Sequence, residues 1–277
     1  MSYPTKNVDD AFIINPLVTL PSSFGVLHVG ESFACTLCVN NELDKSSSNT
    51  SITGLRMTAT MQTPSNPDGI PLDLTGPTPE CDTGIDLAPG ETFARIARFD
   101  LREEGTHILQ PTVTYTETTT APDGTAASGG RVRTFRKLYQ FAAQQLLSVR
   151  TKAQALPPQT EQKSAQYVLE AQVENMGDVL IVLEDVRLLP KPQFAARGVN
   201  LWDVPSLRPG KGEKLHMRPG EIQQVCFLVM KAEGQEGVEP EVTRDGRTVL
   251  GQLAINWRGP MGEYGSLSTG WLSTRRR

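Results

Sequence analysis

The chain has 277 residues, of which 38% are hydrophobic and 21% charged, and its formal net charge is −4. This length predicts about two domains, and the composition is too apolar for a disordered chain. Basic residues gather only at Arg275, Arg276 and Arg277. A nucleic-acid partner is therefore not expected, because binding phosphates requires a concentrated face of Lys and Arg.

The first 20 residues carry Lys6, Asp9, Asp10 and Pro16 and lack the pattern of a signal peptide. No stretch of about 18 apolar residues is present to span a membrane. We therefore expect the protein to be made and kept in the cytosol. In that reducing compartment the four cysteines are expected to be free thiols: Cys35, Cys38, Cys81 and Cys226.

Alternation of apolar and polar residues is the dominant pattern along the chain. It predicts strands at residues 32–39, 166–174 and 249–257. Turn sequences such as Pro67-Asp68-Gly69 and Pro122-Asp123-Gly124 separate the strands. Short strands separated by such turns are typical of β-sandwiches or barrels and not of βαβ units.

A weak internal repeat indicates similar units. A Gly-Glu pair precedes an extended apolar run three times, at Gly30-Glu31, Gly90-Glu91 and Gly220-Glu221. Glycine accepts the dihedral angles of a turn, and we expect the glutamate to stay solvated at the start of each strand.

The segment 135–149 has two interpretations. Phe135, Leu138, Tyr139, Ala142 and Leu146 fall at helical spacing, but part of the segment also alternates. The β-rich surroundings favour two strands joined by a bend near Gln144-Gln145. The chain then divides into an N-terminal tail (1–15), a first sandwich (16–144), a second sandwich (145–270) and a basic C-terminal tail (271–277).

The sequence does not identify a catalytic, cofactor-binding or metal-binding residue, and the partner-binding residues are unknown at this stage. Cys35-Thr36-Leu37-Cys38 has the spacing of a metal or redox site, but the two thiols of an alternating strand point to opposite faces. Catalytic motifs such as the nucleophile elbow or the phosphate-binding loop are missing. The remaining candidates are interpreted as structural or solvated residues: His28, His107, His216, Asp82, Asp86, Asp100, Glu103, Glu104, Trp202, Trp257 and Trp271.

Several of these segments together resemble a known family, subunit 13 of the trafficking protein particle (TRAPP) complex. The blocks keep their order from about residue 17 to the C-terminus, and none is a catalytic signature. They are Leu17–Gly25, Val29–Phe33, Glu104–Leu109, Phe135–Lys137, Leu169–Met176 and Gly251–Trp257, followed by Gly262-Glu263 and Gly265.

The resemblance implies tandem immunoglobulin-like β-sandwiches in a non-catalytic accessory subunit without cofactors. It implies other TRAPP subunits as partners, an indirect link to a Rab-type GTPase, and peripheral membrane association at the Golgi through the complex alone. The residues carried over are structural: Gly30, Glu31, Phe33, Gly105, His107, Asn175 and Trp257. Family members continue into a further sandwich, whereas this sequence ends at Arg277.

Two other functions compete with this expectation. A generic appendage-like sandwich adaptor would bind short peptides without forming a stoichiometric complex. An enzyme or lectin on a β-scaffold would depend on His107 and the acidic residues near it.

Overall fold

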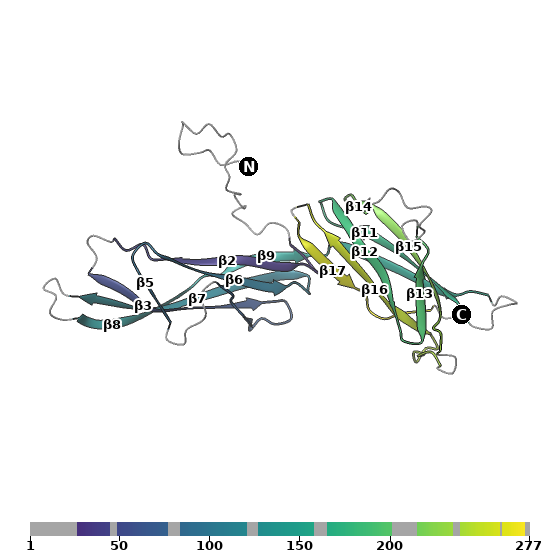
Figure 1. Cartoon of the computed structure of the whole chain (residues 1–277), viewed down its shortest axis with the longest axis horizontal. Coiled ribbons are helices and arrows are strands. Elements are labelled where there is room, and N and C mark those ends of the chain that lie inside the picture. The colour runs from purple at the N-terminus through teal and green to yellow at the C-terminus, as the bar shows by residue number, and fades with distance from the viewer. Residues whose placement is uncertain are drawn as a thin grey trace, which may run out of the picture.

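The computed structural model describes residues 27–44, 49–76, 84–120, 127–157, 165–200, 215–234, 239–260 and 262–274. These residues form strands and connecting turns, with no helix among them. The strands build two sandwiches that follow one another along the chain (Figure 1). The predicted all-β fold with tandem immunoglobulin-like sandwiches is confirmed. No helix that could span a membrane occurs in the described part of the chain.

The first sandwich has a seven-stranded sheet with the order β1-β9-β7-β3-β4, in which β5 also pairs with β3 and β8 with β7. The pair β2-β6 forms its second sheet. The core lies between the sheets, where Phe33 meets Met61 and Leu109. The strands are β1 (Leu27–His28), β2 (Ser32–Asn40), β3 (Thr50–Gln62), β4 (Ile70–Leu72), β5 (Ile85–Leu87), β6 (Thr92–Asp100), β7 (Gly105–Thr120), β8 (Ala127–Arg136) and β9 (Tyr139–Gln144).

The second sandwich has a four-stranded sheet, β10-β11-β15-β13, and a five-stranded sheet, β14-β12-β16-β17, with β18 paired to β16. Leu169 and Val225 of the first sheet share a core with Trp257 of the second. The strands are β10 (Leu147–Ala155), β11 (Tyr167–Asn175), β12 (Ile181–Pro190), β13 (Phe194–Gly198), β14 (Leu215–Met217), β15 (Ile222–Lys231), β16 (Val249–Arg258), β17 (Tyr264–Ser268) and β18 (Leu272–Ser273).

The three strands predicted from alternation are confirmed as β2, β11 and β16. The segment 135–149 is extended and not helical: it contains the end of β8, all of β9 and the start of β10. A break at Lys137-Leu138 was not expected, and the bend falls at Gln145-Leu146. Alternation decides the structure here because Phe141 and Ala143 are buried while their neighbours are exposed.

The C-terminal boundary of the second sandwich needs correction. Residues 271–273 are not a tail, because Leu272 and Ser273 form β18 and pair with β16. Trp271 lies under Lys191, with the ammonium nitrogen 3.7 Å from the centre of the indole ring. Residues 1–15 and 275–277 lie outside the described residues.

The Gly-Glu repeat is a recurring turn. At residues 28–31, 88–91 and 218–221 the glutamate backbone N–H donates to the carbonyl oxygen three residues earlier, over 3.0–3.1 Å. The glycine in the third position has a positive φ, of 98°, 82° and 74° respectively, which is the pattern of a type II turn. In each turn a carboxylate oxygen of the glutamate accepts the backbone N–H of the first residue over 2.9 Å. The carboxylate therefore closes the turn that the glycine permits.

Two of these turns are held by a buried asparagine, one in each sandwich. Asn41 Nδ2 donates to the carbonyl of Leu87 over 2.7 Å, and Asn175 Nδ2 donates to that of Met217 over 3.1 Å. The backbone of each asparagine also exchanges two hydrogen bonds with the Gly-Glu pair of its turn. The two sandwiches therefore share one structural device, which explains the weak repeat in the sequence.

Candidate functional site

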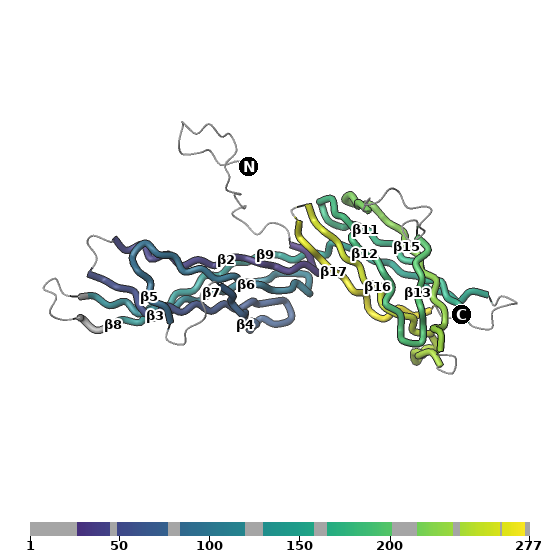
Figure 2. Tube along the Cα trace, in the orientation of Figure 1, coloured from purple at the N-terminus to yellow at the C-terminus, as the bar shows by residue number. Residues whose placement is uncertain are grey.

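The turn His28–Glu31 lies where the first sandwich meets the second. Figure 2 follows the trace, in which β17 lies against the ends of β2 and β6. Gly30 N–H donates to the Leu101 carbonyl over 2.7 Å, and the Gly30 carbonyl accepts the Ser266 N–H over 2.9 Å. Glu31 forms an antiparallel bridge with Gly265. This turn therefore joins the two sandwiches by backbone hydrogen bonds, whereas the turns at 88–91 and 218–221 stay within one sandwich.

Close packing at this junction requires glycine at two positions. A Cβ atom on Gly265 would lie 2.2 Å from Cε2 of Trp257, and one on Gly30 would lie 2.7 Å from Cη2 of the same ring. Trp257 is 1% exposed. The indole thus fills the space that both glycines leave open, and any side chain there must displace the ring or the backbone.

A second contact reaches the junction from β11. The Asn175 carboxamide donates to Val179 and Met217 and accepts the Gly177 N–H over 3.0 Å. A Cβ atom on Gly177 would lie 2.6 Å from the Leu146 side chain and 3.6 Å from His28 Nε2. Asn175 therefore shapes the loop that receives His28.

His28 and Glu31 form a buried polar pair within the junction. Nδ1 of His28 lies 3.3 Å from Oε1 of Glu31, and the two residues are 6% and 7% exposed. Nε2 of His28 is buried and has no hydrogen-bond partner in the described part of the molecule. The expectation that the turn glutamate stays solvated is thus wrong for Glu31, because the second sandwich covers it; Glu91 and Glu221 are exposed as expected.

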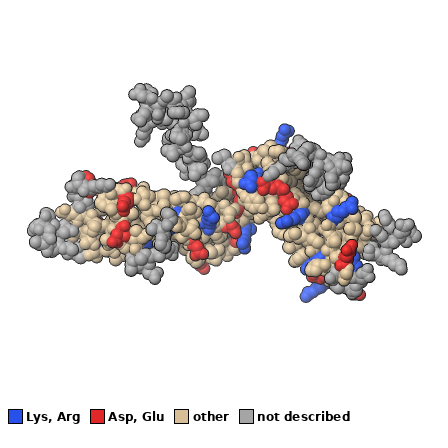
Figure 3. Space-filling model, in the orientation of Figure 1, with Lys and Arg blue, Asp and Glu red and all other residues tan. Residues whose placement is uncertain are grey.

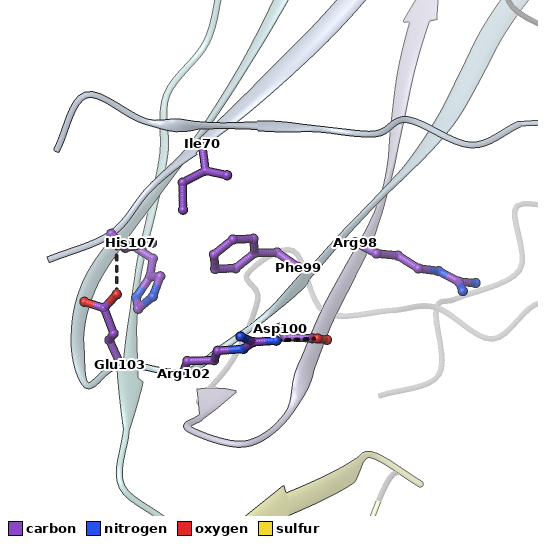
Figure 4. A pocket seen from close by; sticks show the side chains of 8 residues that line it. Ile70, Arg98, Phe99, Asp100, Arg102, Glu103 and His107 are labelled. Atoms are coloured by element: carbon purple, nitrogen blue, oxygen red, sulfur yellow. Dashed lines mark hydrogen bonds and ion pairs between the residues drawn. The ribbon is translucent and has the colours of Figure 1, made fainter. Parts of the chain in front are cut away.

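A cavity of about 470 Å³ opens in the first sandwich, beside the junction (Figure 4). Its walls combine the apolar Ile70 and Phe99 with the charged Asp100 and Glu103, and His107 lies in its wall. The fold thus brings together Asp100, Glu103 and His107, the histidine and nearby acids on which the enzyme alternative would depend.

His107 holds the wall of this cavity through a hydrogen bond and ring packing. His107 is fully buried, its Nδ1–H donates to the Gly105 carbonyl over 3.1 Å, and its ring stacks on Phe141 at 5.6 Å. A general base must reach the proton that it removes, and this imidazole is out of reach of solvent. The ring instead joins an aromatic stack, since Phe33 also stacks on Phe141, with the ring centres 4.9 Å apart.

Glu103 fastens the loop at the mouth of the cavity. Its carboxylate accepts hydrogen bonds from the Ser65 hydroxyl over 2.5 Å, from the Ser65 N–H over 2.9 Å and from the Thr63 hydroxyl over 3.2 Å. The Ser65 hydroxyl is the main cause that lowers the pKa of this carboxyl, because it stabilises the charged form.

Several other candidates lie apart from the junction. Cys35 faces the core and Cys38 faces solvent, so the prediction that the two thiols point to opposite faces is confirmed. Burial raises the pKa of the Cys35 thiol to about 11. His216 is exposed on β14, and Asp86 accepts the Gly54 N–H. Cys81, Asp82 and Trp202 lie outside the described residues.

Four of the family-like residues named from the sequence converge in space. Gly30, Glu31, Asn175 and Trp257 build the junction, whereas His107 stacks on Phe141 in the core of the first sandwich. Sequence reasoning missed Gly177 and Ser266, which complete the contact. The only signal for them was their position beside the blocks 169–176 and 262–265.

The face shown in Figure 3 has no large patch of charge of one sign among the described residues. Lys and Arg side chains are interspersed with Asp and Glu there.

Comparison with known proteins covers nearly the whole chain. The model of the N-terminal domain of trafficking protein particle complex subunit 13 matches residues 1–143, and the model of its middle domain matches residues 147–276. The subunit 13 protein of Mus musculus is 26% identical over 269 residues, which are 97% of this chain and 59% of the relative. The probable homologue of Drosophila melanogaster is 27% identical over 256 residues, which are 92% of this chain and 52% of the relative.

The chain spans less than two thirds of the length of these relatives. Among solved structures, the C-terminal domain of the Streptococcus agalactiae AgI/II polypeptide BspA aligns over 91% of this chain and 95% of its own, with 10% identity and a TM-score of 0.23. The matches to two consecutive family domains decide the relationship. The chain therefore belongs to the family of trafficking protein particle complex subunit 13.

Proposed function

We propose that this chain is a non-catalytic accessory subunit that scaffolds the TRAPP complex, a tether and exchange factor for Rab-type GTPases in ER–Golgi and Golgi traffic. The observation that carries the proposal is the match of both family domains, in order, over residues 1–143 and 147–276. In this proposal the partners are other TRAPP subunits, and contact with the GTPase is indirect. The chain sits in the cytoplasm and reaches trafficking membranes only as part of the complex.

The structure supports a scaffolding role through the junction. Residues of the family blocks serve to hold two sandwiches together by backbone hydrogen bonds and by the packing of Trp257. The boundary between the two sandwiches in this proposal lies between residues 144 and 145. A fixed relation between two sandwiches is useful to a subunit that must hold its neighbours at a set distance.

Affinity purification of the tagged chain from its native cell tests the assembly role. We expect the other TRAPP subunits to co-purify in stoichiometric amounts and to co-elute in size-exclusion chromatography. Recovery of the chain as a clean monomer would contradict the proposal. Binding of short peptides at micromolar affinity without any stoichiometric complex would favour the adaptor alternative.

An exchange assay tests the non-catalytic part. The purified chain alone is added to a Rab-type GTPase loaded with a fluorescent nucleotide. We expect the release rate to equal that of the GTPase alone, and the assembled complex serves as the positive control. Acceleration by the isolated chain would show that it carries exchange activity itself.

A further inference from the structure

Strand β8 differs from every other long strand of the first sandwich, because no sheet covers it. Residues 130–140 are all exposed, and this run includes the second half of β8 and the first residues of β9. In the described chain β8 pairs only with β7, so its other edge presents unpaired backbone N–H and C=O groups. Figure 1 places β8 at the end of the first sandwich that lies away from the second.

Apolar side chains gather on this exposed strand and its continuation. Val132 is 66% exposed, Phe135 42% and Leu138 62%. The described residues include twelve exposed large hydrophobics, and four of them fall between positions 132 and 139. A cluster of this kind marks a contact surface better than single exposed apolar residues do.

The same strand and the residue that follows it are strongly basic. Arg131, Arg133, Arg136 and Lys137 lie within seven residues, and Glu117 is the only acidic residue on the paired strand β7. Glu117 is already engaged by Arg133, with Nε 2.9 Å from Oε2. Four positive charges and one negative charge leave a net charge of +3 on a chain whose overall charge is −4.

These features select among the possible occupants of the edge. A second copy of β8 would bring its own cationic side chains against this set, and like charges on paired strands are unfavourable. A lipid surface could attract the cations, but its headgroups lack the regular ladder of N–H and C=O groups that pairs with a strand edge. An extended protein segment with acidic side chains satisfies the edge, the charge and the apolar side chains together.

We propose that the free edge of β8 docks an extended acidic segment of a partner protein, which joins the seven-stranded sheet as a further strand. By the alternation of the strand, Arg131, Arg133 and Phe135 project from one face of β8, and Val132 and Arg136 project from the other. Because each face of β8 carries both basic and apolar side chains, the docked segment carries both acidic and apolar side chains. The inference rests on the proposed assembly role only for the claim that such a partner exists in the complex.

A synthetic peptide of ten residues that alternates Glu and Val is the probe, and the matched peptide has Lys in place of Glu. Binding to the purified full chain is measured by isothermal titration calorimetry at low and at high salt. We expect micromolar binding of the Glu peptide, several-fold weaker binding at high salt, and no binding of the Lys peptide. Hydrogen exchange should slow in β8 and remain unchanged in β11.

Substitutions on the strand localise the effect. The double variant Arg131→Glu with Arg136→Glu should bind the Glu peptide at least tenfold more weakly. The matched control, Arg244→Glu with Arg247→Glu, makes the same charge change at exposed positions of the second sandwich and should bind normally. Thermal melting of both variants shows whether they fold.

Three results would overturn the proposal. They are equal binding by the Arg131→Glu/Arg136→Glu variant, equal binding of the Lys peptide, and stronger β8-dependent binding to vesicles containing anionic lipid than to the Glu peptide. Co-purification with TRAPP subunits is scored separately. If the peptide fails while co-purification persists, the edge is not the docking surface and the assembly role still holds.

Discussion

At the two ends of the first sandwich, strand β7 pairs with different strands, and these two strands differ in how far they are buried. Near the junction β7 pairs with β9, where Phe141 and Ala143 are buried, and at the far end it pairs with β8, which is exposed from Gly130 onward. Both partner strands contain apolar residues. The difference lies in what covers them: Phe141 and Ala143 pack in the core with Phe33 of β2, whereas no residue from 130 to 140 belongs to a buried cluster of the described chain. Burial is therefore set by tertiary neighbours and not by the strand itself.

The largest effect is expected from filling the junction. Gly265→Ala places a methyl group against Trp257, because an added Cβ atom would lie only 2.2 Å from the indole ring, and it should lower the free energy of unfolding by about 3 kcal/mol. Gly270→Ala is the matched control because open space surrounds that position. Thermal melting measures both variants. An unchanged melting temperature for Gly265→Ala would show that the sandwiches are not packed through the indole.

The two asparagines that hold the Gly-Glu turns should come next. Asn175→Ala and Asn41→Ala each leave a buried backbone carbonyl without its donor, which costs about 2 kcal/mol. Asn40→Ala is the control, since this neighbour of Asn41 is exposed and bonds only the Thr92 hydroxyl through its side chain among the contacts described. Chemical denaturation compares the three variants. If Asn40→Ala were as costly as Asn41→Ala, the turn-holding role would be wrong.

These asparagines also show where sequence reasoning stops. The Gly-Glu pairs were visible because glycine and glutamate recur with fixed spacing before apolar runs. Asn41 and Asn175 were not connected to them, because each contacts its turn across more than 40 residues of sequence. Alternation predicted the strands because it is a local signal, whereas the partner of a turn is decided by topology.

The same limit of local sequence signals applies to the junction and to the free edge of β8. Trp257 could be assigned to an inward face from alternation alone, but the glycines that frame it come from β17 and from the turn before β2. The exposure of β8 could not be predicted at all, because Phe135 and Tyr139 fit a buried strand as well as a free one. Only the arrangement of the second sheet leaves them uncovered.

A smaller effect, dependent on pH, is expected at the cavity beside the junction. The lowered pKa of Glu103 means that its hydrogen bonds stabilise the fold above the unfolded pKa near 4.5 and are lost as the pH falls through the folded pKa. Glu103→Gln should therefore lower the melting temperature slightly at pH 7, and this deficit should shrink as the pH falls through the folded pKa. Glu104→Gln, the exposed neighbour, controls for removal of a charge. A deficit of the Glu103 variant that grew on acidification would contradict this sign.

The smallest effect is expected at the free edge, and it is the sharpest test of the contrast between the two ends. Leu138 is 62% exposed, so Leu138→Ser removes little buried apolar surface and should change the free energy of unfolding by no more than about 0.5 kcal/mol. Leu146→Ser, in the link between the sandwiches, is the matched substitution at a position that is 1% exposed, and it should cost several times more. Denaturation of the isolated chain measures both. If the two substitutions lower the free energy of unfolding equally, Leu138 is covered in solution and the edge is already occupied. If they differ as expected, the apolar side chains of this end are available to a partner.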